Sequence, residues 1–228
     1  MSRLLLALTL VSARRMARGR AANADLEAAV RDAYVDKHQV HHGSITVDGE
    51  AVEFLEAGPK DAAKTVLFCH GAAFSMTTWQ HVGVLDALAE RGMRAIALNL
   101  PGYGASSKTI GGWQGKAGFI RRVVEALDLP STLMIVAASM GGSYALPFVM
   151  DPGPYKIAGY VSAAAVRSRH NARPPSIPIL GIYGSDDLRV QSEDIIGESE
   201  TIHYLCVGPG AVAISSGESW AFRMQRRS

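Results

Sequence analysis

Apolar residues follow two different spacings along this chain. In short runs almost every residue is apolar, as in strands buried on both faces; elsewhere apolar residues recur every three or four positions, as in amphipathic helices. The short runs predict strands at residues 44–47, 52–57, 65–69, 94–98, 132–138, 157–163, 177–183 and 202–207, and we take the last of these as the final strand. The helical spacing predicts helices at residues 26–34, 77–91, 113–127 and 142–150.

The order of these elements predicts the fold class. Asp48-Gly49 lies between the first two strands and is a hairpin signal, because both residues accept the backbone of a tight turn. A hairpin followed by alternating strands and helices predicts an α/β fold, with a mostly parallel sheet and helices on both faces. In such sheets ligands bind beyond the carboxyl ends of the strands, so residues that follow a strand are the candidates for chemistry.

The first candidate stretch is His70-Gly71-Ala72-Ala73, directly after the strand at 65–69. Small residues there allow backbone N–H groups to face a ligand, and two such groups can hold the oxyanion that develops in acyl transfer. The alternative interpretation is an ordinary turn with a hydrogen-bonded histidine. A second stretch, Pro101-Gly102-Tyr103-Gly104-Ala105-Ser106, follows the next strand and predicts a tight turn.

The third candidate is Ser139, where the strand at 132–138 meets the helix at 142–150. In a nucleophile elbow the serine lies on a strained strand-to-helix turn, and small residues two positions before and after it avoid clashes. Ala137 and Gly141 occupy these two positions. We therefore predict Ser139 as a nucleophile, with the N–H groups of Met140 and Ala72 as oxyanion donors. The alternative is that Ser139 only caps the helix.

The fourth candidate is Asp187, in the turn Gly184-Ser185-Asp186-Asp187 after the strand at 177–183. A carboxylate there can orient an imidazole and stabilise its cation. Asp186 is the local competitor, and an ordinary turn is the alternative interpretation.

In this order the four motifs resemble those of the alpha/beta-hydrolase superfamily, over roughly residues 43–207. The stretch HGAAFSMTTWQHVGVLDALAERGMRAIALNLPGYGAS, with SYALPF behind the serine, is most similar to the alpha/beta-hydrolase domain-containing protein 14 group. The resemblance implies an alpha/beta-hydrolase fold and a serine hydrolase or acyl transferase that forms an acyl-enzyme. It implies Ser139 as the nucleophile and Asp187, rather than Asp186, as the acid.

The superfamily places its catalytic histidine in a loop just after the last strand, but this chain has Ala213 near that position. His203 begins the last predicted strand, at the sheet end opposite the nucleophile. His170 follows the sixth strand on the correct side, without a context that marks it as a base. The tail at residues 215–228 also lacks the helical spacing of the family's final helix. These departures predict an altered C-terminus and reduced serine reactivity. They leave open an inactive isoform or a non-catalytic hydrolase-fold binding protein.

Composition sets broad limits on the domain plan. The chain has 228 residues, of which 48% are hydrophobic and 19% charged, with a net charge of +2, which predicts one soluble globular domain and disfavours nucleic-acid partners. Residues 1–24 carry five arginines and no acid, which predicts a leader: a mitochondrial presequence, a secretory signal or a disordered stretch. The predicted plan is a leader at 1–24, a hydrolase core at 25–207 and a divergent tail at 208–228. The cytoplasm, the mitochondrion and the secretory pathway stay open as locations.

The space available for a lid bears on the substrate. Only 13 residues separate Ala163 from Ile177, too few for the lid domain that the superfamily often inserts there. We therefore expect an open pocket and a small acyl ester, amide or thioester as substrate. The sequence has no metal-ligand cluster, no organic-cofactor motif and no G-x-G-x-x-G, which disfavours a nucleotide-binding domain. Coenzyme A as acyl acceptor is implied by the resemblance alone.

Overall fold

We describe the fold from a computed structural model, which describes residues 40–108, 115–165, 177–184, 202–208 and 211–216. The predicted helix at 26–34 lies outside these residues, as do Asp187 and His170. Within the described part of the chain, no helix combines the length and the apolarity needed to span a membrane.

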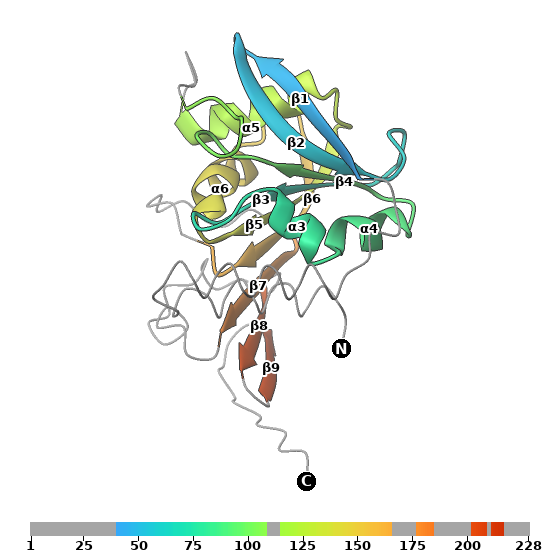
Figure 1. Cartoon of the computed structure of the whole chain (residues 1–228). Helices are drawn as coiled ribbons and strands as arrows, with labels where there is room; N and C mark the ends of the chain where they lie inside the picture. Colours follow the sequence, from blue (N-terminus) through green and yellow to red (C-terminus); the bar gives the residue numbers. More distant parts are fainter. Residues whose placement is uncertain (1–39, 109–114, 166–176, 185–201, 209–210, 217–228) are drawn as a thin grey trace.

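The described strands form one sheet in the order β1-β2-β4-β3-β5-β6-β7-β8-β9 (Figure 1). Strands β4, β3, β5, β6, β7 and β8 are parallel, whereas β1, β2 and β9 run antiparallel to their neighbours. The strands are β1 (His41–Val47), β2 (Glu50–Ala57), β3 (Thr65–Cys69), β4 (Arg94–Leu98), β5 (Thr132–Ala138), β6 (Lys156–Ala163), β7 (Ile179–Gly184), β8 (Ile202–Gly208) and β9 (Ala211–Ser216). The predicted α/β class with a mostly parallel sheet is confirmed.

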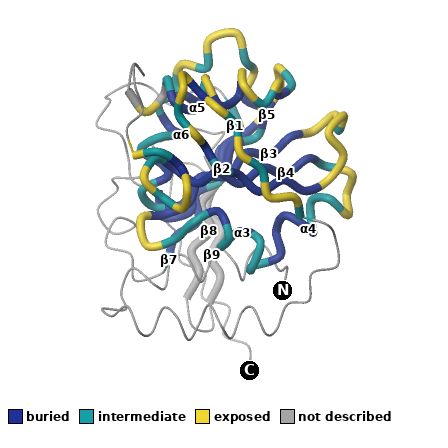
Figure 2. The backbone as a smooth tube through the Cα atoms, turned by 45° about the horizontal axis from the view of Figure 1, so that its top comes forward, coloured by how far each residue is buried: buried dark blue, intermediate teal, exposed yellow. Residues whose placement is uncertain are grey.

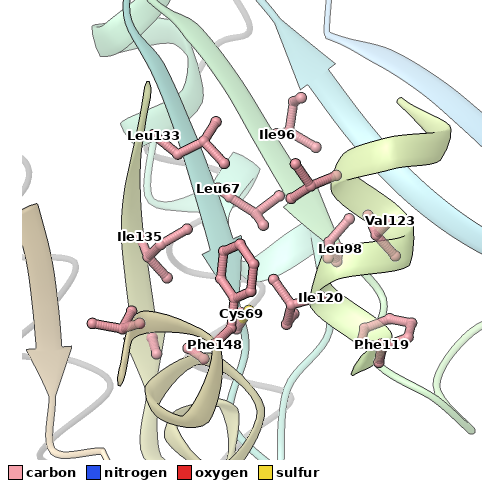
Figure 3. Close-up of a cluster of buried hydrophobic side chains, with 14 of the residues drawn as sticks. Leu67, Cys69, Ile96, Leu98, Phe119, Ile120, Val123, Leu133, Ile135 and Phe148 are labelled. Atoms are coloured by element: carbon pink, nitrogen blue, oxygen red, sulfur yellow. The ribbon is translucent and has the colours of Figure 1, made fainter. Parts of the chain in front are cut away.

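Helices cover both faces of the sheet. The described helices are α3 (Thr77–His81), α4 (Val84–Ala89), α5 (Gly115–Ala126) and α6 (Gly142–Met150). Successive strand residues point to opposite faces, so Leu67 and Cys69 of β3 pack with α5 and α6, whereas Val66 and Phe68 pack with α3 and α4. Figure 3 shows the first of these clusters, and Figure 2 shows the central strands β3 and β4 as buried.

Residues with positive φ angles mark two turns along the chain. The predicted hairpin is confirmed, because β1 and β2 pair around Asp48 and Gly49, whose φ angles are 49° and 85°. The prediction of one helix over 77–91 is wrong. Gly83 has a φ of 72°, which a continuous right-handed helix does not accept, and the segment is divided there into α3 and α4.

The C-terminal end of the sheet also differs from the prediction. Strand β8 is not the last, because Ala211–Ser216 forms β9 and pairs antiparallel with it. A strand edge carries unpaired N–H and C=O groups, and the β-branched residues Val212 and Ile214 favour strand structure, so the chain can add a strand here. The sheet thus extends into the segment that we predicted as a divergent tail.

Candidate active site

Three of the four predicted motifs meet at one edge of the sheet. Strand β3 lies between β4 and β5, and its last residue, Cys69, pairs with Leu98 of β4 and Ala137 of β5. Because these strands are parallel, the residues that follow them lie at the same carboxyl edge. The fourth motif follows β7, which ends at Gly184, but its Asp187 lies outside the described residues.

Ser139 has the backbone geometry of a strained turn. Strand β5 ends in extended conformation at Ala138, Ser139 has a φ of 45°, and helix η1 (Ser139–Gly141) leads into α6. For a residue with a side chain this left-handed conformation costs about 1–2 kcal/mol. The serine does not act as a helix cap, because neither η1 nor α6 has a side-chain capping hydrogen bond.

The small residues around Ser139 are required by close packing. A Cβ atom on Gly141 would lie 2.6 Å from the carbonyl oxygen of Cys69 and 2.8 Å from that of His70. A Cβ atom on Gly71 would lie 3.3 Å from the Cβ atom of Ser139. The loop after β3 therefore packs directly against the serine turn, as expected for a loop that supplies an oxyanion donor.

The two predicted oxyanion donors are backbone N–H groups. Among the described turns and loops, the N–H group of Ala72 has no backbone acceptor. Met140 lies in the first turn after β5, where an N–H group has no partner within the helix. Ala72 is exposed in a turn that the Phe74 N–H closes by donating to the carbonyl of Gly71 at 3.0 Å. The role of both groups as oxyanion donors stays a prediction.

His70 supports this loop and is not available as a base. Its side chain is buried, Nε2 accepts the Leu100 N–H at 3.0 Å, and Nδ1 donates to the carbonyl of Gly71 at 2.9 Å. The amide of Leu100 can only donate, so the Nε2 lone pair is occupied. Burial lowers the pKa of His70 from 6.5 to about 4, although the hydrogen bond to Gly71 opposes the change. The ring is therefore neutral at pH 7.

This buried histidine predicts a loss of stability in mild acid. Between about pH 6.5 and pH 4 the unfolded chain binds a proton at His70 that the folded chain does not. The stabilisation is thus complete above pH 6.5 and is lost as the pH falls toward 4, at up to about 1.4 kcal/mol per pH unit. Urea unfolding of the wild type and of His70→Asn at several pH values measures the effect.

The informative quantity is the difference between the two proteins as the pH falls, because other groups that titrate contribute to both. We expect a shallower loss of unfolding free energy in His70→Asn. Parallel curves for the two proteins from pH 6.5 to pH 4 would contradict the assignment.

A partly buried polar network, which no sequence motif revealed, holds the turn after β4. Asn99 donates from Nδ2 to Glu53 Oε2 at 2.9 Å and accepts the Met76 N–H on Oδ1 at 2.9 Å. The Ser106 hydroxyl donates to the carbonyl of Asn99 and accepts the Glu53 N–H, each at 2.9 Å. Ala105 N–H also donates to Glu53. The network ties β2 to both loops at the site.

The charge of Glu53 suits this role. Burial opposes its ionisation, but hydrogen bonds from the Ala105 N–H and Asn99, together with nearby His42, lower its pKa overall. His42 Nε2 lies 2.9 Å from Glu53 Oε1. The sequence signals for this network were weak. They were a polar Asn99 directly after a buried strand, and Ser106 after two glycines.

The strand register separates the C-terminal candidates for the base from Ser139. His203 pairs with Leu180, two residues before the row that joins Ala138, Ala163, Ile182 and Leu205. Strand β8 lies three strand spacings from β5, about 14 Å at roughly 4.8 Å each. Ala213 of β9 pairs with Cys206 of β8, so it lies one strand spacing further from β5. The structure does not bring either position to the serine.

The other histidines in the described strands and helices outside β8 lie in β1 and α3. His41 and His42 lie in β1, and His81 ends α3. Within the described residues there is no cluster of His, Cys, Asp and Glu that could hold a metal ion.

Comparisons with known proteins show the family of this chain. The family model described as "Alpha/beta hydrolase family" matches residues 66–222. Putative protein-lysine deacylase ABHD14B of Rattus norvegicus is 37% identical over 160 residues, which cover 65% of this chain and 75% of the relative. Protein ABHD14A of Mus musculus is 37% identical over 136 residues, which cover 57% of this chain and 54% of the relative.

A solved structure shows the same fold. The crystal structure of a predicted CIB-like hydrolase from Thermoplasma acidophilum superposes with a TM-score of 0.65 at 19% sequence identity, covering 75% of this chain and 87% of that one. A sequence identity this low supports the fold and not a shared function. The family match, the relatives and the strained serine turn after β5 lead to one conclusion: the chain belongs to the alpha/beta hydrolase family, in the group of the ABHD14 proteins.

Proposed function

We propose that this chain is a serine hydrolase or acyl transferase that acts on small acyl esters, amides or thioesters through an acyl-enzyme on Ser139. The observation that carries the proposal is the φ of 45° at Ser139, on a turn packed against the loop after β3. A non-glycine residue in this conformation persists only where the surrounding structure imposes it, and such strain clusters at functional sites.

In the proposed reaction the Ser139 hydroxyl oxygen forms a bond to the substrate carbonyl carbon, and its proton passes to a base oriented by Asp187. The carbonyl electron pair moves onto oxygen, where the N–H groups of Ala72 and Met140 donate to it. Each such donor contributes about 3–4 kcal/mol to transition-state stabilisation. The tetrahedral intermediate then expels the leaving group, which takes up the proton, and water hydrolyses the acyl-serine ester.

The relatives suggest which amide to test. The ABHD14B proteins carry the name of putative protein-lysine deacylases, so we propose an acylated lysine side chain as the amide substrate. Hydrolysis of its amide would release lysine and the carboxylic acid. Water is the acceptor that we propose, since coenzyme A rests on the resemblance alone.

A fluorophosphonate probe tests the proposal. We expect the wild type to be labelled and mass spectrometry to place the adduct on Ser139. Ser139→Ala should not be labelled, whereas Ser131→Ala should be labelled like the wild type, because Ser131 is an exposed serine at the opposite end of β5. Labelling that persists in Ser139→Ala would exclude this serine as the nucleophile.

One observation favours a second candidate function, a non-catalytic hydrolase-fold protein that binds a small molecule. Ala213, near the position at which the resemblance leads us to expect the family's histidine, lies within β9. If the folded wild type, checked by circular dichroism, takes up no probe and hydrolyses neither p-nitrophenyl acetate nor an acetyl-lysine peptide, this second function is favoured.

A further inference from the structure

Tyr103 touches both residues whose N–H groups we assign to the oxyanion site. Its hydroxyl lies 3.1 Å from the carbonyl oxygen of Ala72 and 3.5 Å from the sulfur of Met140. A phenol has one hydrogen to donate, and a carbonyl oxygen is the stronger acceptor, so the hydroxyl donates to Ala72 and contacts Met140. One side chain from the turn after β4 thus joins the loop after β3 to the turn after β5.

The ring of Tyr103 also packs against the histidine that anchors the first loop. Its centroid lies 4.6 Å from that of His70, with the rings at 68° in an edge-to-face arrangement. This geometry is favourable for aromatic pairs and fixes the direction of the phenol. The hydroxyl is therefore held where it meets Ala72 rather than being free to rotate into solvent.

The backbone that carries Tyr103 is held tightly. Tyr103 N–H donates to the carbonyl of Leu100, and Ser106 N–H donates to the carbonyl of Tyr103, each at 3.0 Å. Gly104 has a φ of 55°, and a Cβ atom on it would collide with the Asn99 amide and the Glu53 carboxylate. The polar network of Glu53, Asn99 and Ser106 thus gives Tyr103 a rigid base.

Met140 is also held through its backbone, by a hydrogen bond from Ser143. The Ser143 hydroxyl donates to the Met140 carbonyl at 2.7 Å and accepts from Lys116 Nζ at 2.7 Å. Ser143 holds the carbonyl of Met140, and Tyr103 holds the end of its side chain. Ala72, in contrast, lies in an exposed turn, and Tyr103 holds its carbonyl.

We propose that Tyr103 is a positioning residue that sets the two oxyanion donors, Ala72 and Met140, in one geometry. The inference rests on the proposed function and adds a residue to it. Donors stabilise a transition state only when they are already aimed at the developing charge, and small displacements lower the rate strongly. The phenol hydroxyl therefore acts on the transition state through Ala72 and Met140, without contacting the reacting atoms.

Tyr103→Phe tests this, with Tyr155→Phe as the matched control. Tyr155 is another half-buried tyrosine, packed against Phe148 at the remote end of α6. In p-nitrophenyl acetate hydrolysis we expect kcat of Tyr103→Phe to fall about tenfold with KM nearly unchanged, less than the loss on removing a donor outright. The control should keep both constants. A kcat equal to that of the wild type overturns the inference.

Hydrogen exchange gives a readout that does not depend on turnover. In Tyr103→Phe we expect faster amide exchange at residues 71–73 and 139–141, but not in Tyr155→Phe. Unchanged exchange in both segments overturns the positioning role. Failure of the fluorophosphonate to label wild-type Ser139 overturns the proposed function and this inference with it, whereas labelled Ser139 with an unaffected Tyr103→Phe overturns this inference alone.

Discussion

Replacing Ser139 with alanine is expected to lower kcat for p-nitrophenyl acetate by at least about a thousandfold, to the rate that oxyanion donors and binding support without a nucleophile. The alanine keeps the left-handed φ of 45° and the packing against Gly71, so only the hydroxyl is lost. Steady-state kinetics of purified wild type, Ser139→Ala and Ser131→Ala measure the effect. Activity retained in Ser139→Ala would refute the acyl-serine mechanism.

The same position offers a stability test of the strained turn. Glycine accepts a positive φ without penalty, so Ser139→Gly should unfold at a higher urea concentration than Ser139→Ala, by roughly 1 kcal/mol, while being equally inactive. A position that is more stable with glycine than with a side chain, but needs the serine for activity, has a strained conformation that is kept for function. A glycine variant less stable than the alanine variant would show that the turn carries no such strain.

Replacing Gly141 with alanine is expected to reduce the free energy of unfolding by at least about 4 kcal/mol, a loss that is exceptional for one substitution. The backbone of Gly141 is helical, with φ −54° and ψ −29°, so alanine suits it locally. The methyl group would instead collide with the buried main chain at the end of β3. It would lie 2.6 Å from the carbonyl oxygen of Cys69 and 2.8 Å from that of His70. These atoms belong to, or directly follow, a central strand and cannot move independently of it.

Gly159→Ala is the matched control for this substitution. Gly159 lies in β6, and a Cβ atom there would meet its nearest neighbours at 3.5 and 3.7 Å, an ordinary contact distance. We expect this variant to change stability by less than about 1 kcal/mol, toward greater stability. Urea titrations followed by circular dichroism compare the two. Equal effects of both substitutions would remove the steric explanation for a small residue after the serine.

Local patterns predicted the centre of the fold well. The bounds of β3, β4, β5 and α6 agree with the prediction, because their apolar runs are buried by neighbours on both faces and end at small or turn-forming residues. The strained serine turn was also predictable, since its signal lies within five consecutive residues, Ala137 to Gly141.

The parts that sequence reasoning missed depend on distant neighbours. Asn99 and Glu53 are 46 positions apart, and Ser106 and Glu53 are 53 apart, so their contacts follow from the register of β2 against β4 rather than from a motif. We predicted Tyr103 only as part of a tight turn. Nothing in that stretch of sequence indicated that its hydroxyl reaches Ala72. Strand β9 was missed because its pairing with β8 depends on the free edge of that strand.

The burial of Cys69 has a practical consequence. The thiol lies in the strand beneath the serine turn, fully shielded from solvent, and burial raises its pKa to about 12. Thiol reagents attack the thiolate, so iodoacetamide can modify this cysteine only in molecules whose central strands have separated. In a Cys206→Ala background, the alkylation rate of Cys69 therefore reports how often the central strands open locally. It reports this opening in the strand that packs beneath the serine turn.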